Sequence, residues 1–156
     1  MAYLTGEDRY QSSLIPKALD DFIDENNPVR VIDAYINSIN LERLGFVEYS
    51  SSNPGQKPYK RQGLLKIILY CYMNKIRSSR MIEKETGRNI ELMWLTGSLS
   101  PDHGTISGFI KENKLAFKEL FNEYVLLLKG LALIDGDIVA IDGTKIKASN
   151  AKINYS

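Results

Sequence analysis

Residues 61–75 read RQGLLKIILYCYMNK, an apolar series that only Gln62, Gly63, Lys66 and Asn74 interrupt between its basic ends. A series of this length favours a helix that is buried around most of its circumference. Such a helix needs other helices packed on several of its sides. We therefore expect residues 61–75 to form the central helix of an all-α bundle.

Apolar spacing and capping residues predict further helices on both sides of this stretch. Asn27 and Pro28 precede apolar residues at helical spacing, which indicates an amphipathic helix over residues 28–39. A long helix is expected from residue 115 to 129, with Leu115 included in its apolar stripe. The same signals predict shorter helices or single turns over residues 15–23, 41–44, 78–86, 89–95 and 100–113.

After Gly130 the pattern changes from helical spacing to the spacing of a strand. Asp135-Gly136 is typical of a tight turn, and residues 138–141 form a short apolar run rich in β-branched side chains. These features predict a domain boundary near residues 130–135. The expected organisation is a flexible N-terminus (1–14), a helical domain (15–130) and the start of a second domain (131–156).

The formal net charge of +1 conceals a strong segregation of charge along the chain. Residues 1–55 carry 4 basic and 9 acidic groups, whereas residues 56–90 carry 9 basic and 2 acidic groups, a net charge of +7. Electrostatic fields act locally at physiological salt, so this central segment matters more than the overall balance. It indicates a polyanionic partner, and double-stranded DNA is the one we expect.

Within that segment a basic stripe is expected, because Arg77, Arg80, Lys84 and Arg88 are spaced by three, four and four residues. Gly87 interrupts the stripe, and a solvated helix face would explain the same spacing. Short helices with tight connections surround it, as in a helix-turn-helix, which places one helix in the major groove of DNA. The residues predicted to contact DNA are Lys57, Lys60, Arg61, Arg77, Ser78, Ser79, Arg80, Lys84, Arg88 and Lys145.

Residues 140–148 read AIDGTKIKA and place one carboxylate, Asp142, at the end of the strand-like run. Asp135 and Asp137 have the opposite strand parity, so they would point to the other face of a regular strand. Phosphoryl transfer with two metal ions needs several carboxylates from different elements, which Asp142 cannot supply alone. An Asp-Gly turn is the alternative explanation. Lys145 would contact DNA beside Asp142 or cover a sheet edge.

Other reactive residues are sparse. Cys71 is the only cysteine, which excludes an intrachain disulfide, and His103 is the only histidine, which excludes a His-based metal cluster. The N-terminus has no apolar signal segment, and the longest apolar run, residues 67–73, is too short to cross a bilayer. We therefore expect a cytoplasmic location and no membrane association.

The run around Asp142 resembles the Asp-Gly-Thr-Lys segment on the first catalytic strand of DDE transposases from bacterial insertion sequences. Upstream segments at residues 27–33, 59–72, 76–80, 88–95 and 100–106 resemble, in the same order, the N-terminal helical domain of that family. The resemblance implies a mainly α fold. This would be a multi-helix bundle with a helix-turn-helix-like portion, followed by the first β-strand or hairpin of an RNase H-like domain.

The resemblance assigns the family's first catalytic Asp, a ligand of Mg²⁺, to Asp142. The family's second Asp and its Glu have no counterpart in this sequence. We therefore expect an N-terminal transposase fragment that binds transposon terminal repeats for DNA transposition and is catalytically incomplete alone. Mg²⁺ would serve the full-length enzyme, and no cofactor is expected for this chain. A downstream transposase polypeptide or a second copy is the expected protein partner.

Two other functions agree with the same features. A stand-alone DNA-binding module or regulator would occupy transposon ends without cutting them. A non-functional transposase remnant, or a helical adaptor for other proteins, would bind no DNA. Binding and nicking assays with terminal-repeat DNA separate the three.

Overall fold

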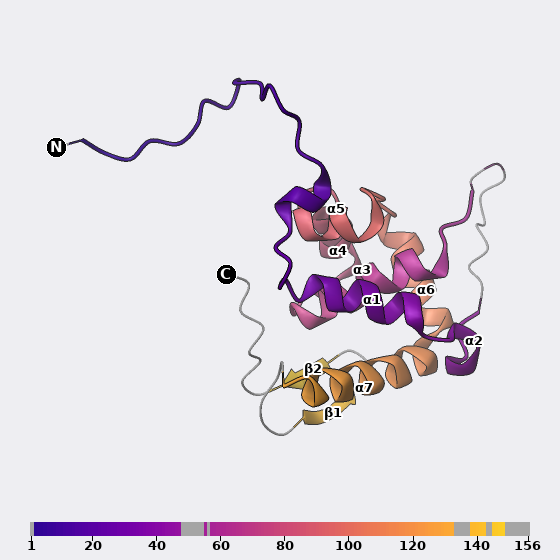
Figure 1. The fold of residues 1–156 in the computed structure, drawn as a ribbon. Helices are drawn as coiled ribbons and strands as arrows, with labels where there is room; N and C mark the ends of the chain where they lie inside the picture. Colours follow the sequence, from indigo (N-terminus) through magenta and orange to yellow (C-terminus); the bar gives the residue numbers. More distant parts are fainter. Residues whose placement is uncertain (1, 48–54, 56, 133–137, 143–144, 149–156) are drawn as a thin grey trace.

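A computed structural model describes residues 2–47, 55, 57–132, 138–142 and 145–148, the last two ranges by their backbone only. Figure 1 shows a body of packed helices, from which the exposed residues 2–17 run away. In chain order the elements are a 3₁₀ helix η1 (Leu19–Phe22), α1 (Val29–Ser38), α2 (Leu41–Leu44), α3 (Arg61–Met73), α4 (Ser79–Thr86), α5 (Ile90–Thr96), α6 (His103–Glu112), α7 (Lys114–Gly130), β1 (Ile138–Asp142) and β2 (Lys145–Ala148).

The central position predicted for residues 61–75 is confirmed by α3. Eight of its thirteen residues are buried, and α1, α4, α5 and α6 all contact it. Each of these helices contributes fully buried apolar side chains, among them Ile32, Ile82, Leu92 and Phe109. The mainly α class predicted from the sequence is therefore confirmed.

Aromatic side chains join α7 to the rest of the body. Phe117 meets Phe46 edge-on, with ring centroids 5.1 Å apart, and Phe121 stacks on Tyr72 of α3 at 5.3 Å. Phe109 of α6 also meets Phe117 edge-on at 5.6 Å. Such pairs contribute about 0.5–1.5 kcal/mol each beyond the burial of their area, so this cluster fixes how α7 packs on α3 and α6.

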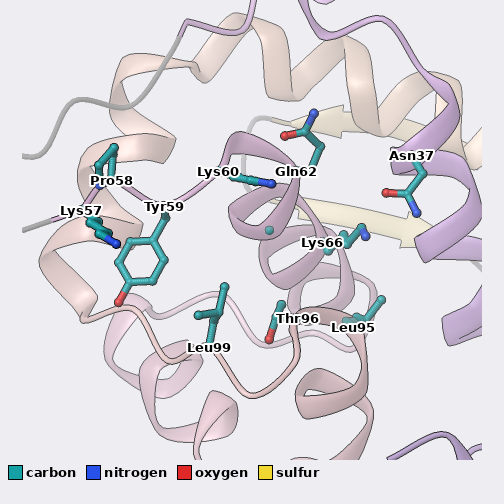
Figure 2. A pocket seen from close by; sticks show the side chains of 11 residues that line it. Asn37, Lys57, Pro58, Tyr59, Lys60, Gln62, Lys66, Leu95, Thr96 and Leu99 are labelled. Carbon is teal, nitrogen blue, oxygen red and sulfur yellow. The ribbon is translucent and has the colours of Figure 1, made fainter.

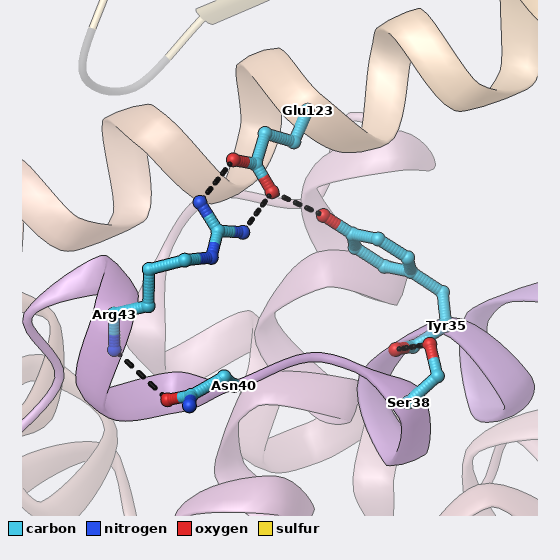
Figure 3. A network of polar contacts seen from close by, with 5 residues as sticks. All are labelled: Tyr35, Ser38, Asn40, Arg43 and Glu123. Carbon is cyan, nitrogen blue, oxygen red and sulfur yellow. Dashed lines mark hydrogen bonds and ion pairs between the residues drawn. The ribbon is translucent and has the colours of Figure 1, made fainter.

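A polar network joins α2 to α7 on the surface, as Figure 3 shows. The Arg43 guanidinium donates two hydrogen bonds of 2.9 Å to the two carboxylate oxygens of Glu123. Tyr35 of α1 donates to the same carboxylate at 3.4 Å. Burial, with the Glu123 charge beside it, raises the pKa of Tyr35 to about 12. A single carboxylate on α7 therefore binds side chains from two N-terminal helices.

Local signals place most helix ends correctly. Asn40 caps α2 by accepting a hydrogen bond from the Arg43 N–H at 2.9 Å, and α2 ends at Gly45 with a φ of +88°. Asn89 caps α5 in the same way, and Gly97 ends it. The helix expected from residue 28 to 39 is confirmed as α1 (Val29–Ser38). A non-glycine residue would be strained at Gly45, because its φ lies in the left-handed region.

Two details differ from expectation. The helix predicted over residues 15–23 is limited to η1, which the Asp20 carboxylate anchors by accepting hydrogen bonds from Trp94 (2.9 Å) and Arg30 (3.0 Å). Leu115 is 80% exposed instead of buried. The buried stripe of α7 repeats every three or four residues from Phe117, and Leu115 lies off that spacing.

Beyond α7, the backbones of β1 and β2 pair antiparallel, with Ile138 opposite Ala148 and Asp142 opposite Lys145. β1 contacts α7, and Figure 1 shows both strands beside that helix. The assignment of this segment to an RNase H-like domain stays a prediction. Among the helices that the structure describes, none has the length and apolar character needed to span a membrane.

Candidate nucleic-acid interface

A cleft of about 800 Å³ opens at the start of α3. Its walls come from α1 (Asn37), from residues 57–60, from the first turns of α3, and from the end of α5 with the loop that follows (Leu95, Thr96 and Leu99). Figure 2 shows Lys57, Pro58 and Tyr59 at one end of the cleft and Asn37 at the other. The cleft therefore combines segments that are far apart in the sequence.

Lys57 and Lys60 put two positive charges on the rim of the cleft. Lys57 and Lys60 are exposed, and neither makes an ion pair with another described residue. Lys66, deeper in the cleft, is different. Its Nζ lies 2.7 Å from the Asp33 carboxylate, and its side chain is only 12% exposed. An incoming anion would therefore meet Lys57 and Lys60 before any other lysine of the cleft.

Arg61, also predicted to contact DNA, is held by the protein itself. Its guanidinium donates to the Phe46 carbonyl oxygen at 2.9 Å and to the Glu42 carboxylate at 2.6 Å. The hydrogen bond from Arg61 is the main cause that lowers the pKa of Glu42. Only 14% of the Arg61 side chain is exposed. Its position favours a role in fixing the end of α2 against the start of α3.

α4 supplies a second exposed basic surface. Arg80 and Lys84 are four residues apart on this helix, so they lie on the same face, and both are exposed. In the described part of the chain, neither forms an ion pair. The opposite side of α4 carries Ile82 and Thr86, which are buried. These two cations therefore point away from the helical body.

The ends of the predicted stripe lie outside α4, because the helix begins at Ser79 and ends at Thr86. Arg88 follows the helix and donates a hydrogen bond of 2.6 Å from its Nε to the Glu85 carboxylate. Burial of Glu85 opposes its ionisation, but the hydrogen bonds from Arg88 and Asn89 outweigh that effect and lower its pKa. Arg77 precedes the helix, and its Nε is buried with no hydrogen-bond partner among the described residues.

The two serines predicted to contact phosphate lie at the start of α4. Ser78 is the N-cap residue and is exposed, but its side chain makes no capping hydrogen bond. Ser79 is the first helical residue and is partly buried. Both lie within two residues of Arg80, at the N-terminal end of the helix that carries the exposed basic face.

Asp142 and Lys145 end β1 and begin β2, and their backbones are register partners. Their side chains lie outside the described part of the structure. Among the side chains that are described, no three His, Cys, Asp or Glu residues gather into a group that could hold a metal ion.

The structure brings Lys57, Lys60 and the start of α3 together at one cleft, and it puts Arg80 and Lys84 on a separate helix. Sequence reasoning missed Asn37, Thr96 and Leu99 as walls of the cleft. No local pattern marks them, because each is brought to the cleft by the packing of its own helix or loop on α3. The basic cluster around Tyr59 was the only signal near this site.

The fold and the site thus define a mainly helical domain with exposed cations on two surfaces. Residues 17–112, more than half of the chain, match the family model described as Transposase domain (DUF772). The chain belongs to this transposase-domain family. Neither the curated proteins nor the solved structures contain a match to the chain.

Proposed function

We propose that the helical domain binds double-stranded DNA at transposon ends, as part of DNA transposition. Lys57, Lys60, Arg80 and Lys84 would contact the phosphates. The observation that carries this proposal is that all four are exposed and free of ion pairs with described residues, inside the +7 segment of a transposase-family domain. Cations in this state are available to replace the counterions of DNA.

The other predicted contacts have smaller roles in this proposal. Arg61 and Arg88 already bind protein carboxylates, so a DNA phosphate would have to compete with Glu42 and Glu85. Only residues 87–89 separate α4 from α5. This short connection supports a helix-turn-helix-like arrangement, in which α4 presents its basic face and its N-terminal backbone N–H groups to the duplex.

The resemblance of residues 140–148 to the first catalytic motif of DDE transposases supports a separate role for Asp142. We propose that Asp142 is a Mg²⁺ ligand in strand cleavage and transfer, and that Lys145 contacts DNA next to it. Mg²⁺ would activate the attacking oxygen and stabilise the charge on the phosphate. DNA binding by the helical domain does not depend on Asp142 in this proposal.

A salt titration tests the DNA-binding role. Affinity for a terminal-repeat duplex is measured by fluorescence anisotropy at several salt concentrations, for the intact chain and for Arg80→Ala/Lys84→Ala. Loss of two phosphate contacts should reduce the slope of log K against log salt by about 1.8. The control Lys111→Ala/Lys118→Ala removes the same charge from exposed positions on α6 and α7. Equal slopes for both double variants would refute the role of α4.

A nicking assay tests the division between binding and chemistry. The chain is incubated with terminal-repeat DNA and Mg²⁺, and Asp142→Asn is measured beside it. We expect binding without nicking from the chain alone, and the same affinity for Asp142→Asn. Nicking by the chain alone would contradict the expected catalytic incompleteness. Equal losses of affinity from Asp142→Asn and from Arg80→Ala/Lys84→Ala would contradict the separation of roles.

A further inference from the structure

The cleft at the start of α3 has a composition that phosphate contacts alone do not explain. Its rim is cationic, through Lys57 and Lys60, and its lining combines polar side chains with the Tyr59 ring and apolar residues. Leu95 is buried at its base, Leu99 is 44% exposed, and Tyr59 is a partly buried wall that packs on the core. An aromatic face and an apolar floor are suited to a flat, weakly polar ring.

Polar groups are also available inside the cleft. Gln62 is exposed on the first turn of α3, and its amide offers a donor and an acceptor with no partner among the described residues. Thr96 uses its hydroxyl hydrogen to bind the Leu92 carbonyl at 3.1 Å, which leaves the oxygen lone pairs to accept. The Thr96 hydroxyl can therefore accept a hydrogen bond from the polar edge of a ring held between Tyr59 and the floor.

The size of the cleft is compatible with an unstacked base. Its volume of about 800 Å³ lies within the usual range of sites for small ligands, which is about 300–1,000 Å³. A base inside a closed duplex is stacked on both faces and shows only its edges to a protein. An unpaired base can leave the stack, enter a cleft and place its flat face on an aromatic side chain.

We propose that this cleft binds one unpaired nucleotide at the end of a DNA duplex. Its base would stack on Tyr59, its edge would meet Thr96, and its phosphate would lie at Lys57 and Lys60. The inference rests on the proposed DNA-binding function and deepens it. The protein would recognise a DNA end with an unpaired nucleotide in preference to a blunt end.

Gly63 allows the cleft to be blocked without damage to the fold. It lies in the first turns of α3, and a Cβ built on it would have Leu99 Cδ1 as its nearest neighbour, at 4.0 Å. A larger side chain would extend into the cleft from there, and it would also favour the helix more than glycine does. Gly63→Leu therefore fills the site and keeps α3 helical. Gly108→Leu on α6, where a Cβ meets nothing within 4 Å, is the matched control.

The experiment compares a blunt duplex with the same duplex carrying a three-nucleotide overhang, by fluorescence anisotropy with the full chain. Stacking of one base on an aromatic side chain predicts a roughly tenfold preference for the overhang. We expect this preference in the intact chain and in Gly108→Leu, and its loss in Gly63→Leu. Equal affinity of the intact chain for both duplexes would overturn the inference, while the proposed duplex binding would stand. Binding to neither duplex would overturn both.

A second readout reports on Tyr59 directly. 2-Aminopurine in the overhang should lose fluorescence when it stacks on the ring, and Tyr59→Leu should abolish that quenching. Tyr10→Leu, at a tyrosine that is 86% exposed on the N-terminal segment, is the control and should keep it. Quenching that persists in both Tyr59→Leu and Gly63→Leu would place the base elsewhere and refute the cleft as its site.

Discussion

Arg61→Ala should lower the stability of the helical body, although sequence reasoning assigned this residue to DNA. The guanidinium donates a charge-assisted hydrogen bond of 2.9 Å to the Phe46 carbonyl, and its side chain is 14% exposed. Hydrogen bonds to charged groups contribute about 1.5–3 kcal/mol. The pair with Glu42 adds little to this, because that carboxylate is 71% exposed and solvent screens it. We expect a loss of about 1–2 kcal/mol, discounted from that range for partial exposure.

Thermal unfolding measures this loss. A loss of this size corresponds to a decrease in Tm of about 3–10 °C for a domain of this length. Lys60→Ala is the matched control one position earlier, where the exposed lysine makes no capping bond or ion pair with described residues. Its Tm should stay within about 2 °C of the parent. The slope of log K against log salt for DNA binding by Lys60→Ala should fall by about 0.9.

The reasoning fails if the two variants exchange their effects. An Arg61→Ala protein with an unchanged Tm and a reduced salt slope would show that this arginine serves DNA and not the fold. The DNA measurement is made well below the Tm of both variants, so that unfolding does not imitate a loss of affinity.

Three further predictions concern stability. Hydrogen bonds from the Arg43 guanidinium on α2 lower the pKa of Glu123 below its ordinary value of 4.5. The stabilisation of the fold by ionised Glu123 is therefore complete above pH 4.5 and is lost as the pH falls below that value. The Tm deficit of Glu123→Ala should therefore shrink between pH 7 and about pH 3. Burial raises the pKa of the Cys71 thiol from 9.0 to about 12. The stabilisation of the fold by the buried neutral thiol is therefore complete below pH 9.0 and is lost as the pH rises from 9.0 to about 12. Urea unfolding of Cys71→Ala should show a shallower alkaline decline than the parent, and parallel declines would contradict this. Leu115→Lys should change the free energy of unfolding by less than about 0.5 kcal/mol. Leu120→Ala, at a fully buried position, should lower the free energy of unfolding by about 2–5 kcal/mol. Similar losses in the two variants would refute the exposure assigned to Leu115.

The helices could be predicted because their signals are local. Asn40 with Gly45, and Asn89 with Gly97, bracket short helices with a side-chain cap at one end and a glycine at the other. The burial of α3 follows from its own composition, since an almost wholly apolar helix has to be enclosed. Leu115 shows the limit of such reasoning, because an apolar residue next to a buried stripe belongs to it only if its helical angle also fits.

The roles of the basic residues could not be predicted in the same way. Glu42 lies nineteen positions before Arg61, and only the packing of α2 on the body makes them a pair. Nothing in the residue types distinguishes Arg61 from the free Lys60 beside it. The pair of Glu85 and Arg88 was within reach of sequence reasoning, because they are three positions apart at the end of a predicted helix.

The contact between Arg43 and Glu123 also has a consequence for synthesis of the chain. These residues are eighty positions apart, so α2 must leave the ribosome long before its partner has been translated. Until α7 emerges, the earlier part of the chain lacks both this carboxylate and the phenylalanines that pack on Phe46 and Tyr72. Completion of the body is therefore a late event during translation, and a nascent chain halted before α7 would expose apolar surface to chaperones.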